Sequence, residues 1–335
     1  MKKVLLLLLS TTLLILVACG SGGESESGSG DGESTSIKLA HSGSESHQYQ
    51  IAAEKFKESV EEKTDGGVTI EIHGNATLGS EADAVEQVMD GSLEMTTVAA
   101  DSSFANTVEE MNVFGIPYLF DDEDHVYSVL DGEIGQDLLD KTSEYDMKGL
   151  GYWEVGFRHL TNNQREINQP EDVEGLKIRV QPSDVWEEHM SALGAEPTPV
   201  DFNELYSALD QGVVDGQENP LPTIDSMKFY EVQDHVALTS HTYSPAIVVM
   251  NQGVFDGLTD EQQTAVEEAV TETTEYHRET LAEKEDEIKQ KLKDNGVTIT
   301  EPNREAFREA TQDVKEAVSD RVPEDLINRI EEARN

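Results

Sequence analysis

The sequence predicts an α/β fold with two lobes, and three observations support this prediction. Short apolar strands alternate with amphipathic helices from residue 37 onward, which is typical of α/β proteins. The 335 residues are enough for one large core or two ordinary ones. A helical pattern without glycine or proline runs from 260 to 295; it would be about 54 Å long, whereas a lobe of about 150 residues is about 40 Å across. We therefore expect this helix to span both lobes and to brace them.

The individual elements follow from the spacing of apolar residues. The expected strands are 37–40, 68–72, 93–98 and 176–180, and the expected helices are 50–63, 80–89 and 260–295. Asp201 and Glu204 form the pattern of a capping box ahead of a helix that ends at Gly212, and Thr259 and Gln262 form the same pattern ahead of the long helix. This alternation predicts largely parallel sheets. A coiled-coil dimer is the alternative for the long helix, but its apolar stripe is narrow and interrupted by charge.

The first 36 residues are predicted to be an export signal and a spacer. Lys2 and Lys3 precede an apolar run at 4–17, which is shorter than the about 20 residues of a membrane span. The Leu-Val-Ala-Cys segment at 16–19 resembles a bacterial lipobox, in which the cysteine receives the lipid, and Cys19 is the only cysteine. We expect 1–19 to be a lipoprotein signal peptide, with an uncleaved anchor helix as the alternative. Residues 20–36, rich in glycine, serine and acidic residues, predict a flexible linker.

The charge balance excludes one class of partner. The chain has 24 lysines and arginines against 69 aspartates and glutamates, a formal charge of −45. Nucleic acid is excluded, because phosphate attraction needs clustered cations. An extracellular protein this acidic suits a saline or alkaline medium, where salt screens the self-repulsion of its surface.

No enzyme or metal motif is present in the sequence. It contains no G-x-S-x-G, H-E-x-x-H, Walker A or G-x-G-x-x-G pattern. The nine histidines lack metal-ligand spacing, and a single cysteine excludes an intramolecular disulfide and a cysteine zinc site. The sequence therefore predicts no catalytic residue, no metal and no cofactor.

Arginine is the more informative residue type. Arg158, Arg165 and Arg179 are the only arginines in the first 277 residues. A guanidinium binds a carboxylate with two parallel hydrogen bonds, so these residues predict an anionic ligand. The alternative is that each arginine pairs with a nearby acid such as Glu166 or Asp172, and Arg165 is the best candidate for such a surface pair. Arg179 fits that alternative least, because it lies mid-strand opposite an apolar face.

At these residues the sequence resembles the DctP-type solute-binding proteins of tripartite ATP-independent periplasmic (TRAP) transporters. The resemblance covers about 37–325 and is most specific between 179 and 220. The matching segments are 78–81, 114–120, 156–158, 176–180, 193–199, 202–206 and 214–220.

The resemblance implies a binding site residue by residue. Arg179 matches the strand arginine that makes a two-pronged salt bridge to the ligand carboxylate, and Arg158 matches an assisting arginine. Asn219 is expected to hydrogen-bond the ligand, and Phe202 is expected to pack on its carbon skeleton.

Further contacts from the first lobe vary with the ligand in this family. Glu81, Asp101 and His47 lie where such contacts arise. Trp186 departs from the family pattern, since a smaller residue is frequent there, and this implies a different pocket volume or entrance. The alternative for Trp186 is a packed helix residue.

The implied architecture is a periplasmic-binding-protein-like clamshell whose two lobes exchange strands, with one long helix spanning both. Lobe I is expected at 37–156 plus 245–284, and lobe II at 157–244 plus 285–335. The ligand is enclosed between the lobes, where exclusion of water strengthens an arginine–carboxylate contact.

The predicted function is that of a lipid-anchored extracytoplasmic receptor on the outer face of the cell membrane. It captures a small organic carboxylate and delivers it to a small and a large membrane subunit driven by an ion gradient. A sugar acid such as a hexuronate or aldonate is the favoured ligand, and a C4-dicarboxylate such as succinate or malate is the alternative. A ligand-sensing module and an exported hydrolase are further alternatives.

Overall fold

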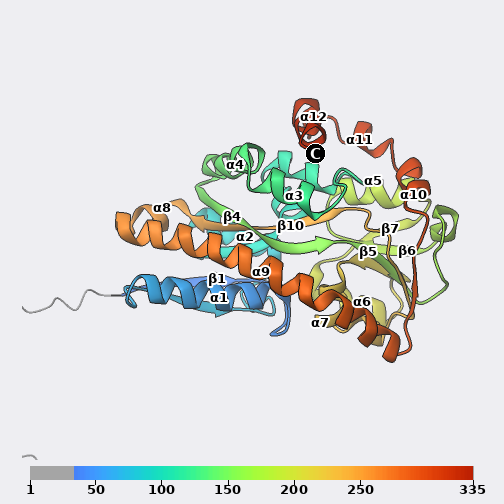
Figure 1. The fold of residues 1–335 in the computed structure, drawn as a ribbon, viewed down its shortest axis with the longest axis horizontal. Helices are drawn as coiled ribbons and strands as arrows, with labels where there is room; N and C mark the ends of the chain where they lie inside the picture. The colour runs from blue at the N-terminus through green and yellow to red at the C-terminus, as the bar shows by residue number, and fades with distance from the viewer. Residues whose placement is uncertain (1–33, 335) are drawn as a thin grey trace, which may run out of the picture. The chain divides into compact units, whose positions relative to one another are not determined.

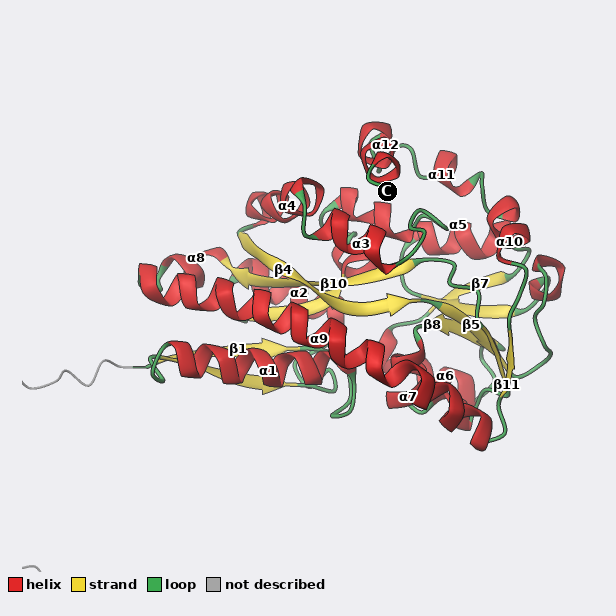
Figure 2. Cartoon of the chain, viewed as in Figure 1, coloured by secondary structure: helices red, strands yellow, loops and turns green. Residues whose placement is uncertain are grey.

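The computed structural model describes residues 34–334, in which two β-sheets are flanked by helices (Figure 1, Figure 2). The expected signal peptide with Cys19, and all but the last three residues of the expected linker 20–36, lie outside the described residues. Within 34–334, no helix combines the length and the apolar character that crossing a membrane requires.

The first sheet has the strand order β2-β1-β3-β10-β4. Its strands are β1 (Thr35–Ala40), β2 (Val68–His73), β3 (Met95–Ala99), β4 (Met147–Phe157) and β10 (Tyr243–Asn251). β1 is parallel to β2 and β3, whereas β10 is antiparallel to β3 and β4. Successive residues of β10 pack into the cores on opposite faces of this sheet, so both faces are buried.

The second sheet has the strand order β11-β9-β5-β8-β6-β7. Its strands are β5 (His159–Asn162), β6 (Lys177–Val180), β7 (Glu196–Pro199), β8 (Gly216–Asn219), β9 (His235–Ala237) and β11 (Thr298–Thr300). β6 is parallel to β7 and β8, and β5 is antiparallel to β8 and β9.

Two strand connections join the sheets. The chain leaves the first sheet at the end of β4, enters the second through β5, and returns from β9 into β10. The expectation of largely parallel sheets is therefore correct for β1–β3 and β6–β8 and wrong beside these connections. Strands that leave and return side by side must run in opposite directions.

Helices cover both faces of the sheets. The helices are α1 (Gln48–Lys63), α2 (Glu81–Asp90), α3 (Glu123–Leu130), α4 (Glu133–Asp140), α5 (Asp184–Ala192), α6 (Leu205–Asp210), α7 (Leu221–Ser226), α8 (Gln252–Asp256), α9 (Asp260–Asp294), α10 (Arg304–Ala310), α11 (Val314–Ala317) and α12 (Glu324–Glu332). The expected helices at 50–63 and 80–89 are confirmed as α1 and α2. The capping box expected for Asp201 with Glu204 is wrong: Asp201 caps nothing with its side chain, because a 3₁₀ turn, η5 (Phe202–Glu204), precedes α6.

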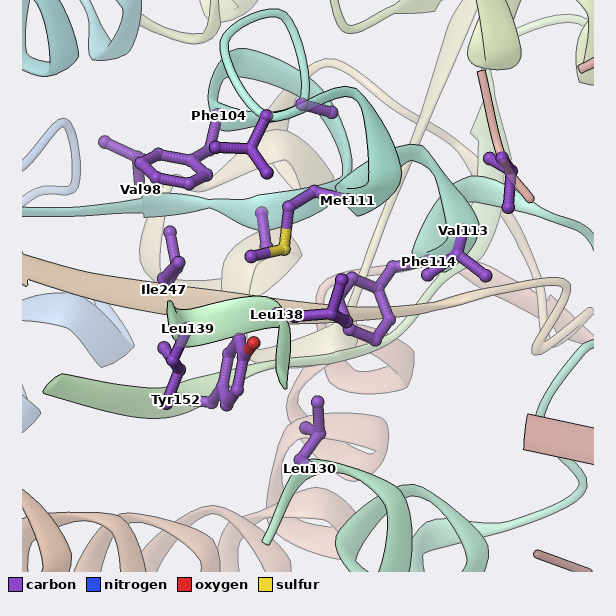
Figure 3. Close-up of a cluster of buried hydrophobic side chains, with 14 of the residues drawn as sticks. Val98, Phe104, Met111, Val113, Phe114, Leu130, Leu138, Leu139, Tyr152 and Ile247 are labelled. Atoms are coloured by element: carbon purple, nitrogen blue, oxygen red, sulfur yellow. The ribbon is translucent and has the colours of Figure 1, made fainter. Parts of the chain in front are cut away.

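The largest core lies on one face of the first sheet. Figure 3 shows part of it, where Val98 and Ile247 of the sheet meet Phe104, Met111 and Phe114. Side chains of α11 and α12 extend the same core. Their packing differs from the expected division of the chain, which groups 285–335 with the second lobe. Leu326, Ile327 and Ile330 of α12 lie in the core of the first sheet, whereas Ile288, Leu292 and Phe307 of the same range pack in cores of the second sheet, as expected.

The long helix α9 is the element that links both sheets. It runs beside α1 and β4 and then reaches α7 and β11 (Figure 1). Val266 and Val270 pack in a core of the first sheet, and Ile288 and Leu292 pack in a core of the second. The expectation that this helix spans both lobes is confirmed. Because its apolar stripe is covered by its own chain, that stripe is not free for a coiled-coil partner.

Thr259 is the N-cap of α9. Its side chain accepts a hydrogen bond from Gln262 N, and the Gln262 side chain accepts one from Thr259 N, which completes the expected capping box. We expect Thr259→Ala to lower the free energy of unfolding by about 1 kcal/mol in a denaturant titration. Thr264→Ala, at an exposed position of the same helix, is the control and should change it by less than about 0.5 kcal/mol. Equal effects of the two substitutions would contradict the role of the cap.

Candidate functional site

The carboxyl ends of β3 and β6, one from each sheet, meet at one place. A π-helical turn, η1 (Ala100–Phe104), follows β3, and Gln181 follows β6. Ser102 Oγ of the turn donates to Gln181 Oε1 at 2.8 Å, and Asn106 Nδ2 donates to Pro182 O at 3.0 Å. Ligands of α/β proteins bind at the carboxyl ends of strands where the connections diverge. This region is therefore the candidate site.

Arg179 contributes a buried charge to this region. Its neighbours Ile178 and Val180 point into a core of the second sheet, so alternation turns Arg179 to the opposite face. The side chain is only 1% exposed. Its Nε donates to Val200 O at 2.8 Å, while Nη1 has no hydrogen-bond partner among residues 34–334. Burial lowers the pKa of Arg179 to about 10, so the group is still charged at neutral pH.

A buried guanidinium without a carboxylate partner is costly. Within the described residues, Arg179 forms no ion pair; Glu218, Glu81 and Asp201 favour its charge only from a longer distance. The arrangement suits an anionic ligand that completes the pair. The sequence-based alternative of pairing with a nearby acid is therefore wrong for Arg179 within 34–334.

Arg158 is equally buried, at 1% exposure, but it is already neutralised. Its Nε lies 2.5 Å from Glu218 Oε2, and its Nη2 donates to Glu218 Oε1 at 2.9 Å. Nη1 donates to Ser244 Oγ at 3.2 Å. Burial opposes the charge on Glu218, yet Arg158 and His241 hold the pKa of that carboxyl below its usual value. Arg158 thus forms an internal ion pair beside the charge of Arg179.

Asn219 and Trp186 hold Arg158 in place. Asn219 Oδ1 accepts from Arg158 Nη2 at 3.0 Å, and Asn219 Nδ2 donates to Gln217 Oε1 at 2.5 Å. Trp186 is fully buried, and the centre of the Arg158 guanidinium lies 5.1 Å from its ring. The surroundings of Trp186 are therefore those of a packed helix residue, which was the alternative expected from the sequence. The ligand contact expected for Asn219 stays a prediction, since Arg158 and Gln217 engage both of its polar groups.

The first sheet contributes two carboxyl groups. Glu81, at the start of α2, accepts hydrogen bonds from Ser42 Oγ at 2.7 Å and from Ser103 Oγ at 3.1 Å, and burial raises its pKa. Asp101 in η1 is fully buried. Its Oδ2 accepts from Ser244 Oγ, and its Oδ1 has no partner among residues 34–334. Burial raises the pKa of Asp101 to about 6, with Arg158 acting in the opposite direction.

His47 and Phe202 bring together the start of α1 and the turn η5. His47 caps α1, its Nδ1 accepting from Tyr49 N at 3.2 Å, and burial keeps its pKa well below the usual value. The ring centres of His47 and Phe202 are 5.7 Å apart, edge to face. Gly43 permits this placement, because a Cβ there would lie 2.3 Å from His47 Cγ. No hydrogen bond of the described residues joins these two side chains to Arg179.

Sequence reasoning missed four residues of this region, namely Ser102, Gln181, Glu218 and Ser244. Gln181 had a detectable signal, since it lies two residues beyond Arg179 and alternation places both on one face. Its Nε2 has no partner within 34–334. Ser244 carried no local signal: it becomes relevant only because β10 brings it to Asp101 and Arg158.

Comparison with known proteins identifies the family. Residues 39–320 match the family model described as bacterial extracellular solute-binding protein, family 7, DctP. The chain is 35% identical over 295 residues to the 2,3-diketo-L-gulonate-binding periplasmic protein YiaO of Escherichia coli, covering 87% of this chain and 90% of that protein. It is 33% identical over 285 residues to the C4-dicarboxylate-binding periplasmic protein DctP of Rhodobacter capsulatus, covering 84% of this chain and 85% of that protein.

A solved structure agrees with this match. The TRAP periplasmic solute-binding protein of Polaromonas sp. JS666, bound to D-erythronate, superimposes with a TM-score of 0.87 at 33% identity, covering 90% of this chain and 99% of that one. The two proteins are therefore similar in both fold and sequence. This chain belongs to the DctP family of bacterial extracellular solute-binding proteins, the receptor proteins of TRAP transporters, and has their two-lobed α/β fold.

Proposed function

We propose that this protein captures a small organic carboxylate by an ion pair with Arg179 and presents it to the membrane subunits of a TRAP transporter. The observation that carries the proposal is the buried guanidinium of Arg179, charged and without a carboxylate partner in 34–334. A ligand carboxylate in contact with Nη1 would supply the missing acceptor. The proposal involves binding and release without a chemical step.

A sugar acid is the ligand class that the polar groups of the site favour. Among residues 34–334, Gln181 Nε2 is a donor without a partner and Asp101 Oδ1 is an acceptor without one, and both suit hydroxyl groups. Two of the compared proteins support the same class, since their names state 2,3-diketo-L-gulonate and D-erythronate.

A C4-dicarboxylate is the second candidate, supported by the ligand named for the Rhodobacter relative. Such a ligand needs a second cation for its second carboxylate. Arg158 is the candidate for this role, but the carboxylate of Glu218 already accepts two of its hydrogen bonds. The geometry therefore favours a ligand with one carboxylate and several hydroxyls.

The remaining residues that match the family's binding site have the following roles in the proposed function. Phe202 would pack on the carbon skeleton, with His47 behind it. Glu81 would accept from a ligand hydroxyl in addition to its two serines. Asn219 would act mainly by fixing Arg158.

The lipid anchor is a further part of the proposal. Cys19 would carry a diacylglyceryl group, whose two acyl chains are enough to hold a protein at a membrane. The expected linker 20–36, of which Thr35 and Ser36 belong to β1, would separate the anchor from the folded unit.

Arg179→Ala tests the central ion pair. We expect it to weaken ligand binding by about 30-fold to several thousand-fold, equivalent to about 2–5 kcal/mol, because the ligand carboxylate would be left desolvated and unpaired. Calorimetric titration against aldonates, hexuronates and C4-dicarboxylates measures the effect and identifies the ligand class. Arg165→Ala is the matched control, since Arg165 is exposed and donates to the carbonyls of Asp172 and Glu174. Binding by Arg179→Ala within threefold of wild type would refute the site.

The raised pKa of Asp101 should make the stability of the folded protein depend on pH. Burial raises its pKa to about 6 from the usual 3.8, so the folded protein holds this proton over a range in which the unfolded chain has lost it. The stability that Asp101 contributes is therefore present below about pH 4 and lost as the pH rises through 6. Relative to Asp101→Asn, we expect the wild-type free energy of unfolding to fall by on the order of 3 kcal/mol between pH 4 and pH 7. Parallel pH profiles of the two proteins would show that Asp101 keeps an ordinary pKa.

Mass spectrometry of the protein purified from membranes tests the anchor. We expect a chain that begins at Cys19 and carries acyl chains, and no acylation in Cys19→Ser. An intact 1–18 segment on an unmodified protein would favour the uncleaved anchor helix instead.

A further inference from the structure

Among residues 34–334, three of the segments that connect the two sheets meet at Glu154. The first is β4, which carries Glu154 and continues into β5; the second is β10, which follows β9; the third is α9. Glu154 is 6% exposed although it is a carboxylate. No residue of the ligand site discussed above contacts its side chain by a hydrogen bond within 34–334.

The β4–β10 ladder is interrupted at this point. Its register shifts between Ser244 and Pro245, so that Val155 is an extra residue on β4. Pro245 has no N–H to donate, and Gly156 adopts a φ of +114°, which favours glycine. The strands therefore bend where they leave the first sheet.

Side chains of the long helix α9 form hydrogen bonds to the backbone of β4 beside this interruption. Glu154 N donates to His277 Nδ1 at 3.2 Å, and Thr274 Oγ1, on the same helix, donates to Tyr152 O at 3.1 Å. His277 is fully buried, and burial lowers its pKa to about 3, so its ring is neutral and Nδ1 is free to accept. One side chain of α9 thus holds the backbone of β4 at its bend.

The Glu154 carboxylate ties in the other two segments. Tyr243 OH of β10 donates to Glu154 Oε1 at 2.6 Å, and Arg278 Nε of α9 lies 3.7 Å from the same oxygen. Arg278 is itself held by Asp131, through contacts of 2.6 and 2.9 Å. A buried carboxylate that loses a partner is destabilised, so Glu154 resists separation of β4, β10 and α9.

The same strand connects this cluster to the ligand site. Tyr243 contacts Glu154, while the next residue, Ser244, contacts Arg158 and Asp101. A cavity of about 140 Å³ lies beside the cluster, lined in part by Glu154, Phe157 and Arg278.

We propose that Glu154 is the pivot of lobe movement, a positioning residue that sets the angle between the two sheets through its contacts with His277 and Tyr243. Its effect on binding is indirect. Apparent affinity scales with the fraction of molecules in the binding-competent form, so a looser pivot weakens binding without removing a ligand contact. The inference rests on the proposed function only for its binding readout.

The test measures the lobe angle without ligand. Spin labels at Glu58→Cys on α1 and Ser207→Cys on α6, both exposed positions, report the distance between the two sides. The full chain carries Cys19→Ser, which removes its only cysteine. His277→Leu removes the acceptor for Glu154 N, and Tyr243→Phe removes the hydroxyl. His277→Asn keeps an acceptor at the same position of the side chain, so it is the rescue variant.

We expect His277→Leu and Tyr243→Phe to broaden the ligand-free distance distribution and to weaken carboxylate binding by about 5- to 10-fold, the effect of one lost hydrogen bond. His277→Asn should resemble wild type in both measurements. Glu123→Gln is the matched control, because Glu123 lines the same cavity but is exposed and belongs to α3; it should change neither.

Two results would overturn the pivot. One is an unchanged distance distribution in both His277→Leu and Tyr243→Phe. The other is a His277→Asn variant as broad as His277→Leu, which would mean that packing and not the hydrogen bond matters. Tyr243→Phe removes a single oxygen, so it also serves if the histidine variants do not fold. Because the distance readout needs no ligand, it stays informative if Arg179→Ala refutes the proposed site.

Discussion

The proposed binding of a carboxylate depends on one interaction, that of the ligand with the buried guanidinium of Arg179, which has no ion-pair partner among residues 34–334 of a chain whose formal charge is −45. An acidic surface repels anions at long range, so a carboxylate ligand can be held only by a local cation with little water around it. The fold provides this setting by alternation on β6, which turns two apolar neighbours into the core and Arg179 away from it. Arg158 shows the contrast: the same residue type at the same burial, neutralised by Glu218, contributes no free charge.

The two sheets make such a site possible because their strands end at a common place. Hydrogen bonds between the turn after β3 and the residues after β6 join the sheets there. Two crossing strands and α9 connect the sheets elsewhere, at Glu154. We propose that the first group of contacts surrounds the ligand and that the second sets how far the lobes move. Ser244, which donates to Asp101 in the turn after β3, lies next to Tyr243 on β10, and Tyr243 donates to Glu154.

Much of this fold is predictable from the sequence, and the exceptions have physical reasons. The strand–helix alternation, the capped long helix and the orientation of Arg179 depend on local periodicity, and all three are confirmed. The antiparallel strands beside the crossing, and the packing of α11 and α12 on the first sheet, depend on contacts between distant segments. The Arg158–Glu218 pair joins residues 60 positions apart, and in a chain so rich in carboxylates no sequence pattern singles out Glu218.

A crystal structure of the protein with its ligand would show which group holds the carboxylate. We expect a carboxylate of the ligand within hydrogen-bond distance of the Arg179 guanidinium, at the carboxyl ends of β3 and β6, with Arg158 still paired to Glu218. A neutral ligand at this place, or a carboxylate bound away from Arg179, would contradict this expectation.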